Sequence, residues 1–274
     1  MDLSLYVHDD NAYDHDSQNV AAVVSDTFLS APRLRSASVL GTRLECSPLQ
    51  LPWNQLVSYH SNHGYRQLAD VLQMAIGMQE CVISSGSKIH DVHDGPFVHH
   101  ERLRTLSVPN VDVLNYLSLP SLERLTVSLR SALELSPLAA FLDAASRVRE
   151  LNLIGHFAPS DRCDVRNRLK QLLHSTPFLS GLELGLSSSQ ATNALFSLLT
   201  ESEDLLPELR FLTVHFPSFG MEDEVRALAM VASRSRNGAF AFKMRLSTRL
   251  VRDWRSLERL REFGRRNSVV ECVE

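Results

Sequence analysis

The sequence has no apolar run that approaches the ~20 residues needed for a membrane-spanning helix. Its N-terminus also lacks the basic segment and apolar core that are typical of a secretory signal. The four cysteines, Cys46, Cys81, Cys163 and Cys272, are far apart and include no CxxC pair, so we interpret them as reduced thiols. We therefore expect an intracellular protein, in the cytoplasm or the nucleus, with no membrane partner.

The chain has little excess charge of either sign. Its 28 Lys and Arg residues nearly balance its 32 Asp and Glu residues, which leaves a net charge of -4. This balance provides no general attraction to nucleic acid or to an anionic membrane surface. We therefore do not expect nucleic acid as a partner.

The motifs of common catalytic sites are also missing. The sequence contains no G-x-S-x-G nucleophile elbow, no G-x-x-x-x-G-K-[ST] phosphate-binding loop and no H-E-x-x-H zinc motif. Residues 90–100 hold four histidines and two aspartates, which could bind zinc. However, Gly95 and Pro96 give this loop little rigid support, so a solvated loop is the favoured interpretation. We predict no enzymatic activity, no cofactor and no metal site.

The most informative feature is a repeated segment. Residues 119–127 read Leu-Pro-Ser-Leu-Glu-Arg-Leu-Thr-Val, and residues 206–214 read Leu-Pro-Glu-Leu-Arg-Phe-Leu-Thr-Val. Looser copies lie at residues 32–39, 51–59 and 177–184. The shared pattern Pro-x-Leu-x-x-Leu-x-Val/Leu is typical of a leucine-rich repeat, and its alternating second half predicts a half-buried strand.

Stacked copies of this unit predict the fold. We expect an α/β leucine-rich-repeat solenoid, horseshoe-like, with a parallel inner sheet and with helices and loops on the outer side. One core position recurs in each predicted strand: Ala37, Leu56, Cys81, Leu106, Leu125, Leu151, Leu182, Leu212 and Met244. No ladder of Asn or Cys follows the strands, so the repeats are irregular.

Apolar spacing predicts the helices between these strands. The clearest stripes lie at residues 68–75, 138–145, 165–173, 195–199 and 225–232, and the inward stripe of the last consists of Val225, Leu228, Ala229 and Ala232. Ser136 and Pro137 are the expected start of the second. A terminal helix is expected at about 252–264. We predict one domain over residues 1–274, truncated at its N-terminus because no polar cap precedes the strand at residues 3–5.

Three segments resemble a known family. Residues 51–56 (Leu-Pro-Trp-Asn-Gln-Leu), 65–72 (Tyr-Arg-Gln-Leu-Ala-Asp-Val-Leu) and 206–217 are similar to the C-terminal repeat region of F-box-like proteins of mushroom-forming fungi. The resemblance covers the chain from about Leu3 to its end. It implies the substrate-recognition region of an SCF-type ubiquitin ligase, in which a helical F-box upstream binds a Skp1-type adaptor.

The chain itself shows no F-box. A typical one begins Leu-Pro-x-Glu and continues as amphipathic helices, whereas residues 53–59 after Leu51-Pro52 read as a strand. We therefore expect a Skp1-type adaptor as a partner only if an F-box lies upstream of Met1.

The outward strand positions are the candidate binding site, because repeat proteins commonly bind partners on the concave face of their sheet. We expect Arg124 and Phe211 to be the anchors, since Arg and aromatic residues are enriched at binding hot spots. The central column is expected to end at Arg245 and the neighbouring column at Lys243. The candidate residues are Thr105, Ser107, Arg124, Thr126, Glu150, Asn152, Glu183, Phe211, Thr213, Lys243 and Arg245.

These observations favour a protein–protein interaction module whose partner is an unidentified protein. Substrate recognition in a ubiquitin ligase is the role that the family resemblance implies. The alternative is a structural or scaffold leucine-rich-repeat protein unrelated to ubiquitin. A polar sheet face that binds no partner also stays open.

Overall fold

The computed structural model describes residues 2–7, 31, 33–41, 51–62, 65–84, 96–155, 164–186, 189–202, 204–216, 221–234, 240–246, 258–259, 262 and 270–273. The chain is a mixed α/β structure with a large parallel sheet that does not close on itself. This confirms the α/β class and the parallel sheet predicted from the sequence. The chain divides into two compact units, Met1–Glu123 and Arg124–Glu274.

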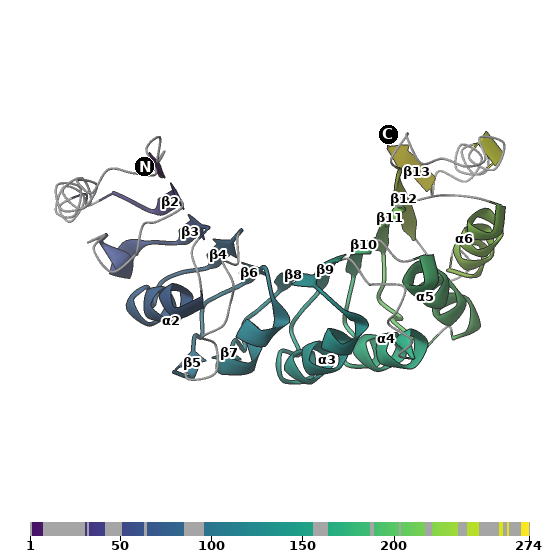
Figure 1. Ribbon diagram of the computed structural model, residues 1–274, viewed down its shortest axis with the longest axis horizontal. Helices are drawn as coiled ribbons and strands as arrows, with labels where there is room; N and C mark the ends of the chain where they lie inside the picture. Colours follow the sequence, from purple (N-terminus) through teal and green to yellow (C-terminus); the bar gives the residue numbers. More distant parts are fainter. Residues whose placement is uncertain are drawn as a thin grey trace, which may run out of the picture. The chain divides into compact units, whose positions relative to one another are not determined.

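The first unit arranges the strands of its sheet in chain order, and neighbouring strands are parallel (Figure 1). The described strands are β1 (Asp2–Val7), β2 (Ser36–Gly41), β3 (Ser58–Ser61), β4 (Glu80–Ile83) and β6 (Thr105–Val108). Helix α2 (Tyr65–Met74) packs on the unit through buried Leu68, Val71 and Leu72. A separate two-stranded sheet pairs β5 (Val98–His99) with β7 (Leu117–Ser118).

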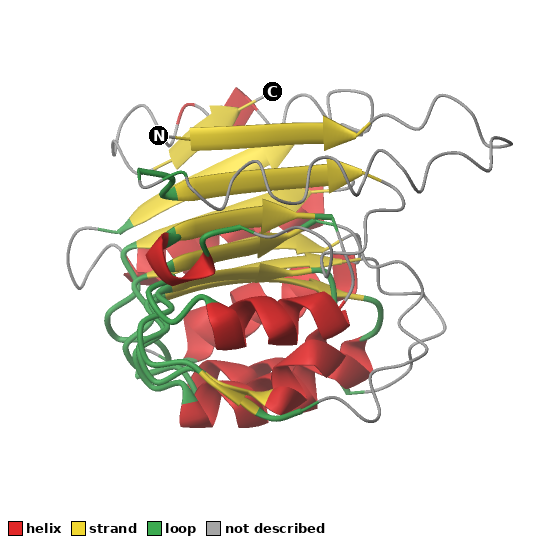
Figure 2. Ribbon diagram, turned by 90° about the vertical axis from the view of Figure 1, so that its left-hand side faces the viewer, coloured by secondary structure: helices red, strands yellow, loops and turns green. Residues whose placement is uncertain are grey.

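The second unit repeats a strand-then-helix arrangement. Its described strands, in the order in which they pair, are β8 (Arg124–Leu129), β9 (Glu150–Gly155), β10 (Gly181–Leu186), β11 (Phe211–Phe216), β12 (Ala241–Leu246) and β13 (Val270–Val273). Its described helices are α3 (Leu135–Ala144), α4 (Val165–His174), α5 (Ser189–Glu201) and α6 (Met221–Arg234). Helices α3 to α6 lie along one face of the sheet, and no described helix of this unit lies on the other face (Figure 1; Figure 2 gives the view from the side).

The core of each unit comes from alternate strand residues. In β8, Leu125, Val127 and Leu129 are buried while the residues between them are partly exposed, as the period of two predicts. Three residues before Leu125, Leu122 fills a second buried layer, and its equivalents are Val148, Leu179 and Leu209. In the first unit Cys81 is fully buried in the strand layer, as predicted.

Backbone hydrogen bonds fix where successive strands begin. The carbonyl of Arg149 accepts from the N–H groups of Ser180 and Gly181, at 2.8 and 2.9 Å, and the carbonyl of Ser180 accepts from those of Arg210 and Phe211. The carbonyls of residues 35 and 57 make the same paired contacts in the first unit. These shared carbonyls align the N-terminal ends of neighbouring strands at one edge of the sheet.

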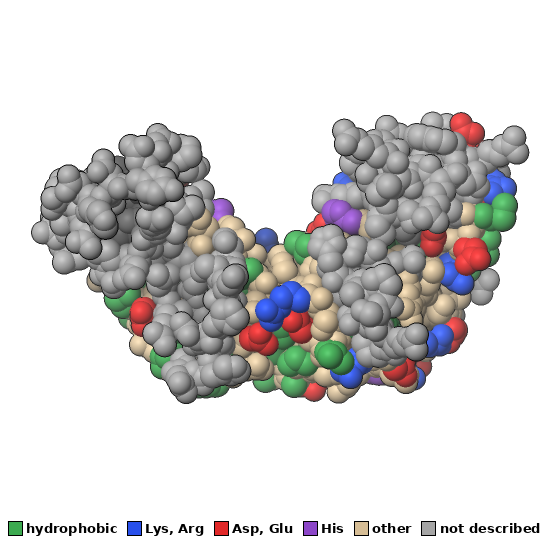
Figure 3. Space-filling view, viewed as in Figure 1, with side chains coloured by type: hydrophobic (Ala, Val, Ile, Leu, Met, Phe, Trp, Pro, Cys, Tyr) green, Lys and Arg blue, Asp and Glu red, His purple; other side chains and the backbone are tan. Residues whose placement is uncertain are grey.

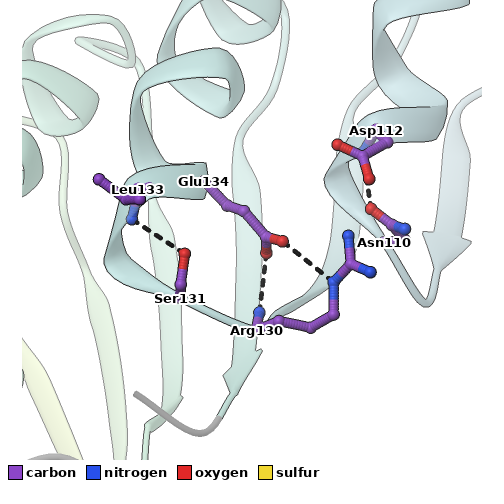
Figure 4. Close-up of polar contacts among 6 residues, drawn as sticks. All are labelled: Asn110, Asp112, Arg130, Ser131, Leu133 and Glu134. Carbon is purple, nitrogen blue, oxygen red and sulfur yellow. Dashed lines mark hydrogen bonds and ion pairs between the residues drawn. The ribbon is translucent and has the colours of Figure 1, made fainter. Parts of the chain in front are cut away.

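Short polar residues order the turns that follow β6 and β8 (Figure 4). The Asn110 Oδ1 atom accepts from the N–H of Asp112 at 2.7 Å and begins the 3-10 helix Val111–Tyr116. Ser131 Oγ accepts from the N–H of Leu133 at 3.2 Å and begins the 3-10 helix Ala132–Glu134. The carboxylate of Glu134 then accepts from both the N–H and the Nε–H of Arg130. Side-chain acceptors of this kind satisfy N–H groups that a helix start leaves open.

Two predicted core positions are in the wrong register. Tyr59, not Leu56, lies opposite Ala37, because residues 53–55 form a 3-10 helix that delays the strand to Ser58. The interpretation of residues 53–59 as one strand is therefore wrong. Phe242, not Met244, lies opposite Leu212. Met244 is buried as expected, but a shift of two residues keeps the same face, so alternation could not identify the row.

The predicted inward face of the last regular helix is also wrong. In α6, Val225 is 61% exposed, and Ala229 and Ala232 are exposed. Instead the helix buries Ala227, Met230 and Val231 between Glu224 and Arg234. The prediction followed the neighbouring stripe of apolar residues, and it assigned to solvent the two charged side chains at the ends of the buried face.

Specific partners make the burial of these charges possible. Arg234 is the last residue of α6. Its guanidinium donates to three backbone carbonyls, that of Leu199 in the last turn of α5 and those of Ser202 and Leu206 in the segment that follows α5. Glu224 lies in the first turn and accepts from Arg259 Nη2 at 2.7 Å. Both ends of α6 are therefore anchored by polar contacts.

The helix boundaries differ modestly from the predictions. Helix α3 starts at Leu135 directly after a 3-10 turn, rather than at the Ser136-Pro137 pair. The predicted terminal helix at about 252–264 lies largely outside the described residues, of which 258, 259 and 262 are helical. In the part of the chain that the structure describes, no helix has both the length and the apolar character needed to span a membrane. A single domain over residues 1–274 stays a prediction.

Candidate functional site

The candidate binding surface of the second unit consists of the strand positions of β8 to β12 that alternate with the buried leucine positions, here called the open face. Strand register orders these residues into three rows, read from the N-terminal to the C-terminal ends of the strands. The first row is Arg124, Glu150, Gly181, Phe211 and Ala241. The middle row is Thr126, Asn152, Glu183, Thr213 and Lys243. The last row is Ser128, Ile154, Gly185, His215 and Arg245.

The sequence placed nine of its candidates on these strands, and two of them occupy different rows from those expected. Lys243 lies opposite Thr213 in the middle row, and Arg245 lies opposite His215 in the last row. Both were expected one row nearer the N-terminal edge. The cause is again the two-residue shift of β12, which preserves the face of each residue but moves its row.

Phe211 is the most exposed large apolar side chain among the described residues of the open face. Its side chain is 61% exposed, and its neighbours in the first row are Gly181 on β10 and Ala241 on β12. Neither neighbour has a side chain long enough to cover an aromatic ring. Phe211 therefore presents much of its ring to solvent.

The sequence analysis missed a second apolar residue, Ile154. It is 44% exposed and lies between Ser128 and Gly185 in the last row. From strand spacing and rise, Ile154 and Phe211 are roughly 16 Å apart along the diagonal of the face. The sequence did contain a signal for it, because the alternation of outward and inward positions in β9 continues for two residues beyond Leu153 and places Ile154 outward.

The two glycines of β10 leave room between these apolar residues. An added Cβ at Gly181 would lie 3.4 Å from the Cγ atom of Glu150, and one at Gly185 would lie no closer than 3.7 Å to any neighbour. These are ordinary contact distances, so packing does not require glycine at either position. Glycine weakens a strand interior, and it often marks a place where another molecule approaches closely.

Charged groups on the open face are arranged in cross-strand pairs. Arg124 Nε lies 3.6 Å from Glu150 Oε2, with both side chains mostly exposed. Glu183 Oε1 lies 2.7 Å from His215 Nε2, a second contact that sequence analysis did not anticipate. Exposed pairs of this kind contribute little to stability, but they orient polar groups on a preformed surface.

Asn152 stands in the centre of the middle row between Thr126 and Glu183. Its Oδ1 atom is buried and has no hydrogen-bond partner among the described residues. Buried polar atoms are usually satisfied, but this oxygen is shielded from solvent, so it is not a contact point for a partner.

The first unit carries the remaining two candidates, Thr105 and Ser107. They lie opposite Glu80 and Val82 and are partly exposed. The sequence missed His60, which shares the row of Val82 and whose Nε2 atom lies 2.5 Å from Ser84 Oγ. Because Leu56 was assigned to the core row of the strand, His60 was not recognised as an outward position. The three-residue spacing between Leu56 and Tyr59, which matches that between Leu122 and Leu125, could have identified Tyr59 as the core residue.

The histidine-rich loop lies mostly outside the described residues, which include only His99 and His100 of its histidines. His100 is buried, and its Nε2 atom is 3.1 Å from the carbonyl of Ala75. Its Nδ1 atom accepts from the N–H groups of Arg102 and Leu103. Both ring nitrogens are thus committed to backbone groups, which assigns His100 a structural role. Among the described residues, no three or more His, Cys, Asp or Glu residues are grouped as a metal site.

The described side chains visible in the space-filling view mix apolar, basic and acidic types (Figure 3). The chain was compared with protein-family models and with curated proteins, and neither comparison gives a match.

Proposed function

We propose that the chain is a leucine-rich-repeat solenoid that binds a protein partner on the open face. The recurring strand register, the buried leucine layers and the shared backbone carbonyls at the strand starts support the repeat assignment. Such repeats offer a wide, rigid surface that suits binding more than chemistry.

The observation that carries the binding proposal is the exposure of Phe211. An aromatic side chain that is 61% exposed between a glycine and an alanine loses little conformational entropy on binding and buries a large apolar area. Ile154 provides a second apolar contact, and the arginine–glutamate and histidine–glutamate pairs provide polar contacts around them. This mixture is typical of the centre and rim of a protein interface.

The resemblance to F-box-like proteins supports a more specific role, the recognition of substrates in an SCF-type ubiquitin ligase. In that role the open face holds the substrate, and a Skp1-type adaptor binds an F-box outside the repeats. Co-purification with the adaptor tests this role, using this chain and a version extended upstream. Binding by the extended version alone supports the ligase role, whereas binding by neither favours a scaffold role unrelated to ubiquitin.

The binding proposal is tested by capturing proteins from cell extract on the immobilised chain. We expect Phe211→Ala to reduce recovery of the bound partner about tenfold or more, as expected for a hot-spot aromatic. Phe97→Ala is the matched control, because Phe97 is 66% exposed but precedes β5 in the separate two-stranded sheet. Equal recovery by the wild type and both variants would contradict binding through the open face.

A further inference from the structure

The N-terminal edge of the sheet in the second unit carries a group of arginines. Arg124 begins β8, Arg149 directly precedes β9 with Arg147 two residues before it, and Arg210 directly precedes β11. All four side chains are exposed. Because all strands are parallel, their N-terminal ends lie at the same edge, so residues distant in sequence are gathered there.

Arg149 and Arg210 occupy equivalent positions on alternate strands, with Ser180 between them. The backbone bonds that link Arg149 to Ser180 and Ser180 to Arg210 establish this order. Two strand spacings place the two arginine Cα atoms about 10 Å apart. Ser180 is small and half-buried, and its Oγ donates to the carbonyl of Arg149 at 3.2 Å. It therefore places no long side chain between the two guanidinium groups.

The two guanidinium groups are not neutralised within the described part of the chain. Neither makes a hydrogen bond or ion pair to a described residue. The acidic residues at this edge are Glu123, which contacts Arg104, Glu150, which contacts Arg124, and Glu208, which is exposed two residues before Arg210. Four arginines against these three glutamates leave this edge with a small excess of positive charge, which attracts an anionic group.

The chemistry of these groups indicates the ligand. Guanidinium groups bind carboxylates through paired, charge-assisted hydrogen bonds. Gly181 follows Ser180 and Phe211 follows Arg210, and the two lie opposite each other in the strand pairing, so an exposed apolar side chain lies beside the arginines. A matching segment thus has an acidic residue followed closely by an apolar one.

We propose that Arg149 and Arg210 bind an acidic segment of the partner protein, with an adjacent apolar residue of that segment lying over Gly181 against Phe211. This rests on the proposed function, because it specifies which part of a protein partner reaches the open face. A protein segment fits better than nucleic acid. Beyond the arginines, a phosphate backbone crossing the face would meet Glu150 and Glu183, whereas an apolar side chain is complementary to Phe211.

Fluorescence anisotropy with two labelled peptides tests this proposal. One probe is a glutamate-rich peptide with a single phenylalanine, and the other is its lysine-rich counterpart. We expect the acidic probe to bind, and its affinity to fall at least about tenfold in the Arg149→Ala, Arg210→Ala double variant. The Arg149→Lys, Arg210→Lys variant should lose less, because it keeps the charge but not the forked geometry.

The matched control removes the same charge elsewhere. The Lys170→Ala, Arg226→Ala double variant takes two positive charges from helices α4 and α6, and it should change the affinity by less than about twofold. Raising the salt concentration should weaken the acidic probe's binding.

Three outcomes would overturn the proposal: unchanged affinity in the arginine-to-alanine variant, equally tight binding of the lysine-rich probe, or tighter binding of a single-stranded RNA probe at the same arginines. Failure here is distinguishable from failure of the proposed function. If partner capture still depends on Phe211 but not on Arg149 and Arg210, the open face binds its partner without an acidic segment.

Discussion

Gly155 provides the sharpest test of the packing between neighbouring strands. It ends β9 facing the core, and a Cβ added to it would lie 2.3 Å from the carbonyl oxygen of Leu129 and 3.1 Å from the Leu129 Cβ. An ordinary carbon–oxygen contact is about 3.3 Å or longer, so Gly155→Ala must move one strand by roughly 1 Å. Both strands are held by their parallel pairing, so neither can move without strain.

The expected cost follows from this clash. Overpacking of a well-packed interior costs about 1–3 kcal/mol. At about 2–4 °C per kcal/mol for a chain of this size, Gly155→Ala should lower Tm by about 2–12 °C. Thermal unfolding followed by circular dichroism measures the change.

The glycines of β10 are the matched controls. Gly181→Ala and Gly185→Ala place a Cβ at ordinary contact distance on the open face. Replacing glycine with alanine where the backbone allows it reduces the entropy of the unfolded chain. We therefore expect both variants to unfold at the wild-type temperature or slightly above it. The reasoning is refuted if Gly155→Ala is as stable as the wild type, or if Gly185→Ala is destabilised to the same extent.

Three further substitutions test other contacts by urea denaturation. His100→Ala removes the acceptor of the N–H groups of Arg102 and Leu103, while the carbonyl of Ala75 still accepts from the N–H of Met78. We therefore expect it to lower the free energy of unfolding by about 1–3 kcal/mol, whereas exposed His99→Ala should stay within about 0.5 kcal/mol; equal effects would contradict the structural role of His100. Arg259→Ala removes the described partner of buried Glu224. Because the guanidinium is half exposed, we expect the free energy of unfolding to fall by about 1–3 kcal/mol. Adding Glu224→Gln should restore most of this loss, and no recovery would argue against an unpaired carboxylate as its cause. Leu212→Ala leaves a cavity at a fully buried position and should lower the free energy of unfolding by about 2–5 kcal/mol. A loss near about 0.5 kcal/mol, the usual surface value, would show that the register assigned to β11 is wrong.

The strands were the most predictable part of the fold. The alternation of Leu125 and Val127 with polar residues identifies the buried face without reference to any neighbour. The row of a residue depends on where its strand begins, and that is decided by a turn. For Tyr59 the turn is a 3-10 helix at residues 53–55. For Lys243 it lies between α6 and β12, where residues 235–239 are outside the described part.

Helix α6 was the least predictable element. Its buried face includes Glu224 and Arg234, whose partners are a side chain and backbone carbonyls distant in sequence. A hydrophobic pattern within one helix contains no information about those partners. The candidate site shows the same limit, because Phe211 was identified by its type whereas its exposure depends on Gly181 and Ala241 of the adjacent strands.

The face on which the partner binds can be measured directly by site-specific photo-cross-linking. A photoreactive amino acid replaces either Thr213 in the middle row of the open face or Asp143, which is exposed on helix α3. We expect the captured partner to cross-link to the chain labelled at position 213 and not to the chain labelled at position 143. Cross-linking from position 143 alone would contradict binding on the open face.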